Sequence, residues 1–307
     1  MSHPSPLRNA AFSAAVPRLS VLIPFYRESP VALLRALRTR DPHAVEIILI
    51  DDGSGSVDLS AEVSGFLTHS EMPCELITLA SNEGRARGRN RLTQAARGDY
   101  FLFLDADMLP DDAGFLDRWL DTATHNPAVV FGGFSLHQAP HSRAHAVHRL
   151  MAAKSDCLDA ATRALTPEKY VFTSNLLVRR DVFAAEAFDP GFTGWGWEDT
   201  EWGMRVAARF GVAHIDNTAT HMGLDTPAIL ARKYEQSVGN FARVVARHAD
   251  VVTQYPSYKA ACLLKKLPFT STLRSAFKIV ALTDAAPASM RAFALRLYRA
   301  ALYSQVV

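Results

Sequence analysis

Cysteine is scarce in this sequence, with three residues in a chain of 307: Cys74, Cys157 and Cys262. They are odd in number, far apart and outside any metal-ligand spacing, which argues against a disulfide framework and favours a reducing compartment. No stretch approaches the roughly 20 consecutive apolar residues of a membrane-spanning helix. Residues 1–18 also lack the charged start and long apolar core of a secretory signal. We therefore expect a cytoplasmic protein in which residues 1–18 form a flexible tail.

An excess of charge of one sign is missing too, since 33 Lys and Arg nearly balance 31 Asp and Glu for a net charge of +2. The distribution is nevertheless uneven. Residues 258–307 contain eight basic side chains and one acid, a net +7, which leaves 25 basic and 30 acidic side chains, a net −5, in the rest. A basic end on an acidic body favours an anionic partner such as a lipid surface, and we expect no nucleic-acid partner.

Short apolar runs alternate with helical patterns through the first hundred residues. The runs predict buried strands at 19–25, 45–50, 75–79 and 100–104, and the segments between them predict helices at 30–40 and 84–97. Unbroken apolar strands joined by helices are typical of a parallel sheet covered on both faces. We therefore predict an α/β fold with a mostly parallel central sheet. After about residue 225 the pattern becomes helical, beginning with a helix at 227–248.

Two acidic clusters directly follow predicted strands, Asp51-Asp52 and Asp105-Ala106-Asp107. Because ligands bind at the carboxyl ends of parallel strands, we expect these carboxylates to converge on one crevice. Asp105 and Asp107 are two residues apart on an extended segment, so both side chains point the same way and suit Mg²⁺ or Mn²⁺ bridging to a diphosphate. For Asp51-Asp52, a carboxylate could accept a hydrogen bond from a nucleobase. A solvated turn is the alternative for either cluster.

A third cluster packs three acids among three tryptophans in the run Trp195-Gly196-Trp197-Glu198-Asp199-Thr200-Glu201-Trp202. Tryptophans usually bury and carboxylates usually stay hydrated, so the mixture indicates either a structural corner or a pocket with a carboxylate beside an apolar platform. A sugar suits such a pocket, since its ring has an apolar face and polar hydroxyls. Upstream, small residues and arginines alternate from Gly84 to Arg89, which indicates a phosphate-binding helix start or an exposed basic face.

Taken in order, the segments SVLIPFYRE, IDDGS, NEGRARGRN, LDADM and WGWEDTEWGMR resemble the motifs of inverting family 2 glycosyltransferases with the GT-A fold. The last is similar to the Trp-Gly-x-Glu-Asp motif of galactosyltransferases and chondroitin polymerases. Galactosyltransferases usually have an additional glycine before Glu-Asp, where this chain has Trp197, so the donor sugar stays open. The resemblance implies a Rossmann-like GT-A catalytic domain at 19–225, between the tail at 1–18 and a basic helical extension at 226–307.

The resemblance also implies roles for single residues. The nucleoside and diphosphate of the donor would be contacted by residues that follow the first three strands: Pro24, Tyr26, Asp51, Asp52, Asn82 and Arg89. Asp105 would face the ribose or the donor sugar, and Asp107 would hold Mn²⁺ or Mg²⁺ with His221 as a further ligand. A purely structural histidine is the alternative for His221.

In the acidic motif, Asp199 would act as the catalytic base and Glu198 would bind hydroxyls of the donor or acceptor. Trp195 and Trp197 would stack on sugar faces and keep water out, although core packing is the alternative, and we expect one of the two to be simply buried. The implied reaction is a single displacement in which Asp199 takes the proton of the acceptor hydroxyl. The metal would neutralise charge on the departing diphosphate.

We therefore expect a metal-dependent inverting glycosyltransferase that moves a hexosyl or N-acetylhexosaminyl group from a UDP-sugar to a saccharide or lipid-linked acceptor in surface-glycan synthesis. A sugar-phosphate nucleotidylyltransferase is one alternative, but it needs a glycine-rich loop where this chain has Pro24-Phe25-Tyr26. A catalytically silent nucleotide-sugar-binding scaffold is another, and the intact acids argue against it. No Gln-x-x-Arg-Trp motif of processive polymerases follows, which favours one sugar per encounter.

Residues 261–307 alternate apolar clusters with basic side chains. Basic amphipathic helices can lie on an anionic membrane surface, which would place the enzyme peripherally at the inner face of the membrane. A helical cap that packs on the catalytic domain is the alternative, and dimerisation through the same helices is a third possibility.

Overall fold

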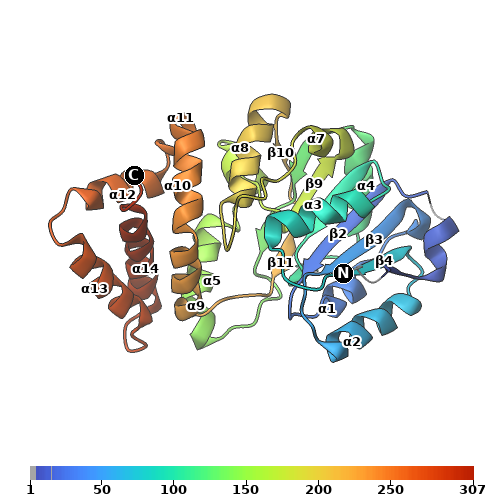
Figure 1. The fold of residues 1–307 in the computed structure, drawn as a ribbon, viewed down its shortest axis with the longest axis horizontal. Coiled ribbons are helices and arrows are strands. Elements are labelled where there is room, and N and C mark those ends of the chain that lie inside the picture. Colours follow the sequence, from blue (N-terminus) through green and yellow to red (C-terminus); the bar gives the residue numbers. More distant parts are fainter. Residues whose placement is uncertain (1–4, 15) are drawn as a thin grey trace.

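The computed structural model describes residues 5–14 and 16–307, and a twisted sheet occupies one side of the molecule (Figure 1). Within the described residues, the eight strands of this sheet have the order β1-β4-β3-β2-β5-β9-β7-β10. Their bounds are β1 Leu7–Arg8, β2 Leu19–Phe25, β3 Val45–Asp51, β4 Cys74–Thr78, β5 Tyr100–Leu104, β7 Val129–Phe131, β9 Asn175–Arg179 and β10 Ala213–His214. Strands β2 to β5 are parallel, whereas β1 and β9 run antiparallel to their neighbours. The predicted mostly parallel sheet is therefore confirmed.

A second, three-stranded sheet lies at the carboxyl ends of the main strands. It has the order β6-β11-β8, with bounds β6 Met108–Pro110, β8 Phe134–Ser135 and β11 Ala219–His221. Strand β11 pairs antiparallel with β6, and the register places His221 opposite Met108. Because β6 begins directly after Asp107, this register brings Asp107 and His221 together although they are far apart in the sequence.

Helices cover both faces of the main sheet, as the unbroken apolar strands predict. One apolar core contains side chains of α1, α2 and α4, and the other contains side chains of α3, α7 and α8. The helices of this part are α1 Val31–Ala36, α2 Val57–Thr68, α3 Arg85–Ala95, α4 Phe115–Thr124, α5 Ala146–Ser155, α6 Ala160–Arg163, α7 Arg180–Ala185 and α8 Glu198–Phe210. The predicted helix at 30–40 is shorter, since Leu37 is already extended.

The remaining helices gather on the side of the molecule opposite the sheet (Figure 1). They are α9 Pro227–Gln236, α10 Val238–Arg247, α11 Ala249–Val252, α12 Pro256–Lys265, α13 Thr270–Leu282 and α14 Ala288–Tyr303. The single helix predicted at 227–248 is divided at Ser237, whose hydroxyl bonds the carbonyl of Tyr234 at 2.8 Å. Serine favours such breaks because its side chain competes for backbone hydrogen bonds.

The C-terminal helices share an apolar core with the catalytic region. Val147 and Met151 of α5, Phe192, and Met204 of α8 join buried side chains of α9, α10 and α14 in one cluster. The helices therefore pack on the catalytic region as a cap, and residue 226 marks no break in the core. Within the part of the chain that the structure describes, no helix is long and apolar enough to cross a membrane.

The N-terminal segment does not form the free tail that we expected for residues 1–18, as far as it is described. Leu7 and Arg8 pair with β4 at the edge of the sheet, and Phe12 is 4% exposed. The Asn9 side chain donates to the carbonyls of Leu67, Ser70 and Met72 and accepts from the Cys74 amide at 3.0 Å. Composition suggested a tail, but edge pairing and one well-bonded asparagine hold the segment on the sheet. Residues 1–4 and 15 lie outside the described residues.

Replacement of Asn9 by alanine tests this attachment. Asn9→Ala removes four side-chain hydrogen bonds and leaves partly buried carbonyls unpaired, so the free energy of unfolding should fall by about 1–3 kcal/mol. Urea unfolding followed by tryptophan fluorescence measures the change. Ser13→Ala, an exposed position in the same segment, is the matched control. Equal stability of the two variants would contradict the attachment.

Candidate active site

Arg85 joins two acidic clusters that are distant in the sequence. It lies in the first turn of α3, where its Nε contacts the carboxylate of Glu198 and one terminal nitrogen lies 3.7 Å from Asp105. Asp105 follows β5 and receives two further bonds, from Arg89 at 2.5 Å and from the Ser174 hydroxyl at 2.8 Å. Arg85 therefore joins the end of β5 to the acidic motif. The convergence that we expected of Asp51 and Asp52 with Asp105 and Asp107 stays a prediction.

The arginines decide the charge state of Asp105. Burial alone would raise the pKa of this carboxyl, but the positive charges of Arg89 and Arg85 outweigh burial and lower the pKa to about 2. Arg89 itself is 1% exposed, and its Nε has no hydrogen-bond partner. The guanidinium of Arg89 thus faces Asp105, and its predicted contact with uracil or diphosphate stays a prediction.

The pKa of Asp199 is shifted in the opposite direction to that of Asp105. It lies in the first turn of α8, and Glu198 precedes it directly. Burial and the neighbouring Glu198 carboxylate raise the pKa of Asp199 to about 7, although Arg85 and Arg89 act against the shift. A carboxyl group that titrates near neutrality can accept a proton at physiological pH and release it again, which is what a general base requires. The two carboxylates at the strand end and the helix start therefore differ in chemistry.

Asp107, two residues after Asp105, forms a second pair with His221. The His221 Nε2 lies 3.2 Å from the Asp107 Oδ2, and the Met222 amide donates to the Asp107 carbonyl at 2.9 Å. Gly223 is required at its position, because a Cβ there would lie 1.9 Å from the Asp107 carboxylate oxygen. Burial would lower the pKa of His221, but its hydrogen bond to Asp107 raises it above the ordinary value.

The pair fits a divalent cation only together with ligands from a substrate. Within the described residues, no group of three His, Cys, Asp or Glu side chains is arranged to hold a metal ion. His148 lies beside His221 with ring centroids 5.8 Å apart, but its Nδ1 accepts the Asp225 amide proton at 2.7 Å. The neutral ring then carries its proton on Nε2, so His148 is not poised as a third ligand. Diphosphate oxygens commonly complete such two-ligand sites.

Asp51 and Asp52 shape the loop between β3 and α2. Asp51 accepts the Ser54 amide at 2.8 Å, and the two oxygens of Asp52 accept the amides of Glu83 at 2.7 Å and Gly84 at 3.0 Å. Burial raises the pKa of Asp52 despite these two bonds. Asp52 therefore braces the start of α3, which carries Arg85, and contact of either acid with a nucleoside stays a prediction.

The other residues expected around the nucleoside differ in exposure. Tyr26 is 41% exposed and has the Arg27 guanidinium 4.9 Å from its ring centroid, whereas Pro24 is half-buried. Asn82 is exposed and lines a polar cavity of about 630 Å³ with Arg87 and five further residues of the loop and of α3. Tyr26 thus offers an open aromatic face, as stacking on a base requires.

The two tryptophans of the acidic motif have different surroundings. Trp197 has a left-handed backbone, with φ of 75°, and its indole N–H donates to the Tyr303 hydroxyl at 2.9 Å. Its ring packs 5.0 Å from that of Phe241. Trp195 instead lies beside α9, with the Lys233 ammonium 5.7 Å from its ring centroid. Trp195 also packs on Tyr234, with ring centroids 6.1 Å apart, so both indoles are half-buried and neither is fully buried as we expected for one of them. The role of either ring as a sugar platform stays a prediction.

Side chains of the C-terminal helices hold the loop that carries the acids. Asn240 donates to the carbonyls of Thr193 at 2.9 Å and Gly196 at 2.8 Å. The Tyr303 hydroxyl, which accepts from Trp197, also bonds Ser237 at 2.8 Å. We call these contacts from Asn240 and Tyr303 the clamp. The catalytic loop is thus fixed from α10 and α14, far along the chain from the sheet.

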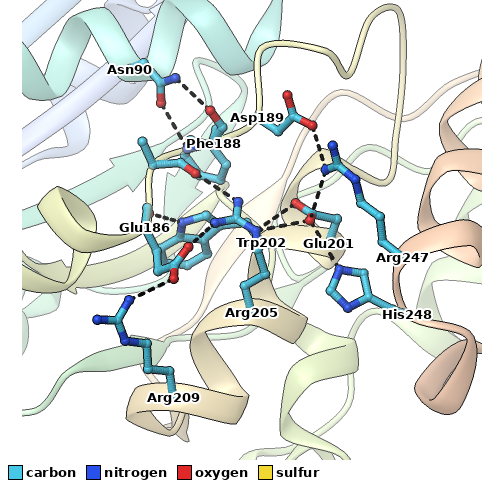
Figure 2. Close-up of polar contacts among 11 residues, drawn as sticks. Asn90, Glu186, Phe188, Asp189, Glu201, Trp202, Arg205, Arg209, Arg247 and His248 are labelled. Atoms are coloured by element: carbon cyan, nitrogen blue, oxygen red, sulfur yellow. Dashed lines mark hydrogen bonds and ion pairs between the residues drawn. The ribbon is translucent and has the colours of Figure 1, made fainter.

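A buried ion cluster attaches α8 to the end of α10 (Figure 2). Glu201 is fully buried and contacts Arg205 at 3.1 Å, Arg247 at 3.4 Å and His248 at 3.2 Å. Arg247 also reaches Asp189 at 2.6 Å. A buried carboxylate needs such partners, and removing them would leave an uncompensated charge. The cluster therefore fixes the axis of the helix whose first turn contains Asp199.

Several of these residues were missed when their roles were assigned from the sequence. Arg85 was part of a recognised motif, so the alternation of small residues and arginines could have indicated it. Ser174, which donates to Asp105, lies just before β9, and a lone serine carries no signal for such a contact. Asn240 and Tyr303 carry no local signal, because only the tertiary packing of α10 and α14 brings them to the loop.

The raised pKa of Asp199 makes a prediction about stability. Below about pH 4 the carboxyl is protonated in both folded and unfolded chains, and between about pH 4 and 7 only the unfolded chain loses the proton. This residue therefore lowers the free energy of unfolding as pH rises across that window. Asp199→Asn should lose this dependence and gain about 1–3 kcal/mol relative to wild type between pH 4 and 8.

Urea unfolding at pH 4, 6 and 8 measures that difference. Asp121→Asn, an exposed position on α4, is the matched control. A constant difference between Asp199→Asn and wild type at all three pH values would show that Asp199 titrates normally.

The clamp gives a second prediction. Tyr303→Phe keeps the ring but leaves the Trp197 indole N–H without its partner, so amides 193–199 should exchange with solvent at least tenfold faster. Hydrogen exchange followed by mass spectrometry measures this loop. Tyr170→Phe, a half-buried tyrosine outside the clamp, should leave the loop unchanged. Unchanged exchange in Tyr303→Phe would mean that the hydroxyl does not hold the loop.

Comparison with known proteins identifies the family. The model of the family described as Glycosyl transferase family 2 matches residues 20–185, which is more than half of the chain. The human polypeptide N-acetylgalactosaminyltransferase 13 is 33% identical over 96 residues, which is 30% of this chain and 17% of that protein. A glycosyltransferase of Haemophilus influenzae is 33% identical over 122 residues, 38% of this chain and 47% of that protein. The chain thus matches less than half the length of either relative.

Solved structures share the fold across nearly the whole chain. The mannosyltransferase PcManGT from Pyrobaculum calidifontis, in complex with GDP-Man and Mn²⁺, has a TM-score of 0.59 and 17% identity, with 94% of this chain and 87% of that chain covered. S. aureus TarS 1–349, in complex with UDP, has a TM-score of 0.52 and 13% identity, with 94% and 90% covered. The fold is the GT-A fold that the sequence predicts, and the chain belongs to glycosyl transferase family 2.

Proposed function

We propose that this chain transfers a sugar from a UDP-sugar to an acceptor hydroxyl by a single displacement that inverts the anomeric centre. The observation that carries the proposal is the Arg85 bridge, since Arg85 contacts both Glu198 of the acidic motif and Asp105 of the strand end. Asp199, with a pKa of about 7, directly follows Glu198, and Asp107, which pairs with His221, lies two residues after Asp105, so the two ends of the bridge support a base and a diphosphate site close together. A base and a diphosphate site within one crevice are the minimum that this reaction requires.

In the proposed reaction, Asp199 accepts the proton of the acceptor hydroxyl as that oxygen attacks the anomeric carbon. Base catalysis of this kind contributes about 10²–10⁴-fold to the rate. Glu198 is held by Arg85, so its second oxygen is positioned to accept a hydroxyl of the donor or acceptor. Trp195 presents its ring beside the same loop, where it would exclude water that could otherwise hydrolyse the donor.

Asp107 and His221 would hold the divalent cation together with the donor diphosphate. A bound cation supplies Lewis-acid stabilisation of the departing diphosphate. Imidazole is a ligand that suits Mn²⁺ better than Mg²⁺, which prefers oxygen, so this donor set favours Mn²⁺. The solved relative PcManGT contains Mn²⁺ and TarS contains UDP, which supports this combination without fixing the donor of this chain.

The nucleobase of the donor would be bound by Tyr26 and Asp52. Pro24, Asp51 and Asn82 would lie around it. The exposed ring of Tyr26 supports the assignment, since a base can stack on it. For the acceptor we propose a saccharide or a lipid-linked saccharide in surface-glycan synthesis, met in the cytoplasm. Membership of glycosyl transferase family 2 supports sugar transfer over the reaction of a sugar-phosphate nucleotidylyltransferase. The experiment below distinguishes an active enzyme from a catalytically silent scaffold.

The test measures UDP release with Mn²⁺ across a panel of UDP-sugars and simple saccharide acceptors. Wild type should turn over one donor, and Asp107→Ala should abolish that turnover because it removes one of the two protein ligands. Asp112→Ala removes a neighbouring exposed acid and is the matched control. Asp199→Asn should bind UDP normally in calorimetry but lose about 10²–10⁴-fold in transfer rate.

The outcomes separate the alternatives. UDP binding without turnover of any donor in the wild type would favour the silent scaffold. Full activity of Asp199→Asn would exclude the proposed base. Turnover of a GDP-sugar alone would keep the reaction and overturn the proposed donor nucleotide.

A further inference from the structure

Exposed apolar side chains are concentrated in the C-terminal helices. Among the described residues, 13 large hydrophobic side chains are exposed, and seven of them lie between residues 263 and 293: Leu263, Leu267, Phe269, Ile279, Leu282, Met290 and Phe293. Helices α12 to α14, which carry them together with the turn between α12 and α13, form the side of the molecule farthest from the sheet (Figure 1). Single exposed apolar residues are normal on a protein surface, but a concentration of this kind marks an interaction site.

The turn between α12 and α13 presents part of this surface. Leu267, Pro268 and Phe269 are all exposed, and Phe269 is 78% exposed with a left-handed backbone, φ 58°. The Thr270 hydroxyl fixes the turn, because it lies within hydrogen-bond distance of the carbonyls of Leu264 at 3.1 Å and Leu267 at 2.9 Å. An aromatic side chain is thus held in solvent on a strained residue, which costs stability without any benefit inside the fold.

Helix α13 lacks the charged outer face that a solvated helix normally has. Its exposed residues are all uncharged: Ser271, Thr272, Ser275, Ala276, Ile279 and Leu282. The Lys278 side chain is directed to Glu235 of α9 at 2.7 Å, so it does not contribute an unpaired charge to that face. The solvent side of α13 is therefore suited to a partner that accepts apolar and small polar groups.

Basic side chains border the apolar residues. Lys259 and Leu263 of α12 and Lys266, which directly follows it, are all exposed at i, i+4 and i+7, so they share one stripe. Lysine stems cover apolar surface while their ammonium groups reach outward, and residues 258–307 carry a net charge of +7. An anionic surface would be attracted to this border while the apolar side chains enter it.

We propose that the surface formed by Leu263, Lys266, the 267–269 turn and the outer side of α13 docks on an anionic membrane. Phe269 and Leu267 enter the boundary between headgroups and acyl chains, and Lys259 and Lys266 contact anionic headgroups. A second copy of this chain fits less well, because a two-fold dimer would place the same basic surface opposite itself. The inference extends the proposed function by bringing the enzyme to a lipid-linked acceptor, but the docking does not depend on the transfer reaction.

Sedimentation of the full chain with vesicles tests the proposal. Vesicles of phosphatidylcholine with 30% phosphatidylglycerol should bind wild type at least tenfold more tightly than phosphatidylcholine alone, and salt near 0.5 M should remove most of that difference. The double substitution Leu267→Ser and Phe269→Ser should weaken binding at least tenfold. Lys259→Gln with Lys266→Gln should weaken it about fivefold per lysine.

Val57→Ser with Leu165→Ser is the matched control, since these residues are 82% and 80% exposed elsewhere on the surface. Equal binding by the control and by both double variants, or no binding of wild type to the anionic vesicles, would overturn the proposal. A wild-type dimer by light scattering that becomes a monomer in Leu267→Ser with Phe269→Ser would assign the surface to a second copy instead. The double variants should release UDP from soluble substrates at the wild-type rate, which separates a loss of docking from a loss of catalysis. Circular dichroism of each variant verifies that it is folded.

Discussion

The placement of Arg85 between Asp105 and Glu198 is the interaction on which the site depends. Asp105, Glu198 and Asp199 are acidic groups from two distant segments, and they would repel one another in a partly buried crevice. The Arg85 guanidinium at the start of α3, together with that of Arg89, offsets this repulsion and holds the carboxylates of Asp105 and Glu198 in place. Arg89 and Arg85 lower the pKa of Asp105, and both limit the rise in the pKa of Asp199, so the cluster presents an anion and a base side by side.

The position of Arg85 depends in turn on Asp52. The two oxygens of Asp52 hold the amides of Glu83 and Gly84, directly before the helix that carries Arg85. Gly53 permits this, since a Cβ there would lie 2.4 Å from the Ser81 carbonyl carbon. Asp52, which directly follows β3, is therefore connected through the 83–84 backbone and Arg85 to Glu198, the first residue of α8.

The sequence was most informative where structure is local. Apolar runs located β2 and β5 at the residues observed, because a buried strand leaves a continuous hydrophobic pattern. The rule that parallel strands direct ligands to their carboxyl ends led us to expect that Asp51 and Asp52 converge with Asp105 and Asp107, but it did not indicate that Arg85 contacts both Asp105 and Glu198. Local patterns could not show the N-terminal attachment through Asn9 or the clamp, since each depends on a partner far along the chain. The break at Ser237 involves a local bond to the Tyr234 carbonyl, so the serine could have indicated it. The two tryptophans look alike in the sequence and both are half-buried, and the hydrogen bond from Trp197 to Tyr303 distinguishes their surroundings.

Gly223 has a consequence for comparing related chains. Its lack of a side chain is what leaves room for the Asp107 carboxylate beside His221, since any Cβ would occupy nearly the same space as the oxygen. A homologue that keeps both the aspartate and the histidine but has alanine at this position would have to move the aspartate carboxylate to make room for the Cβ. The glycine is therefore a marker, readable from sequence alone, of chains in which the pair can adopt the arrangement seen here.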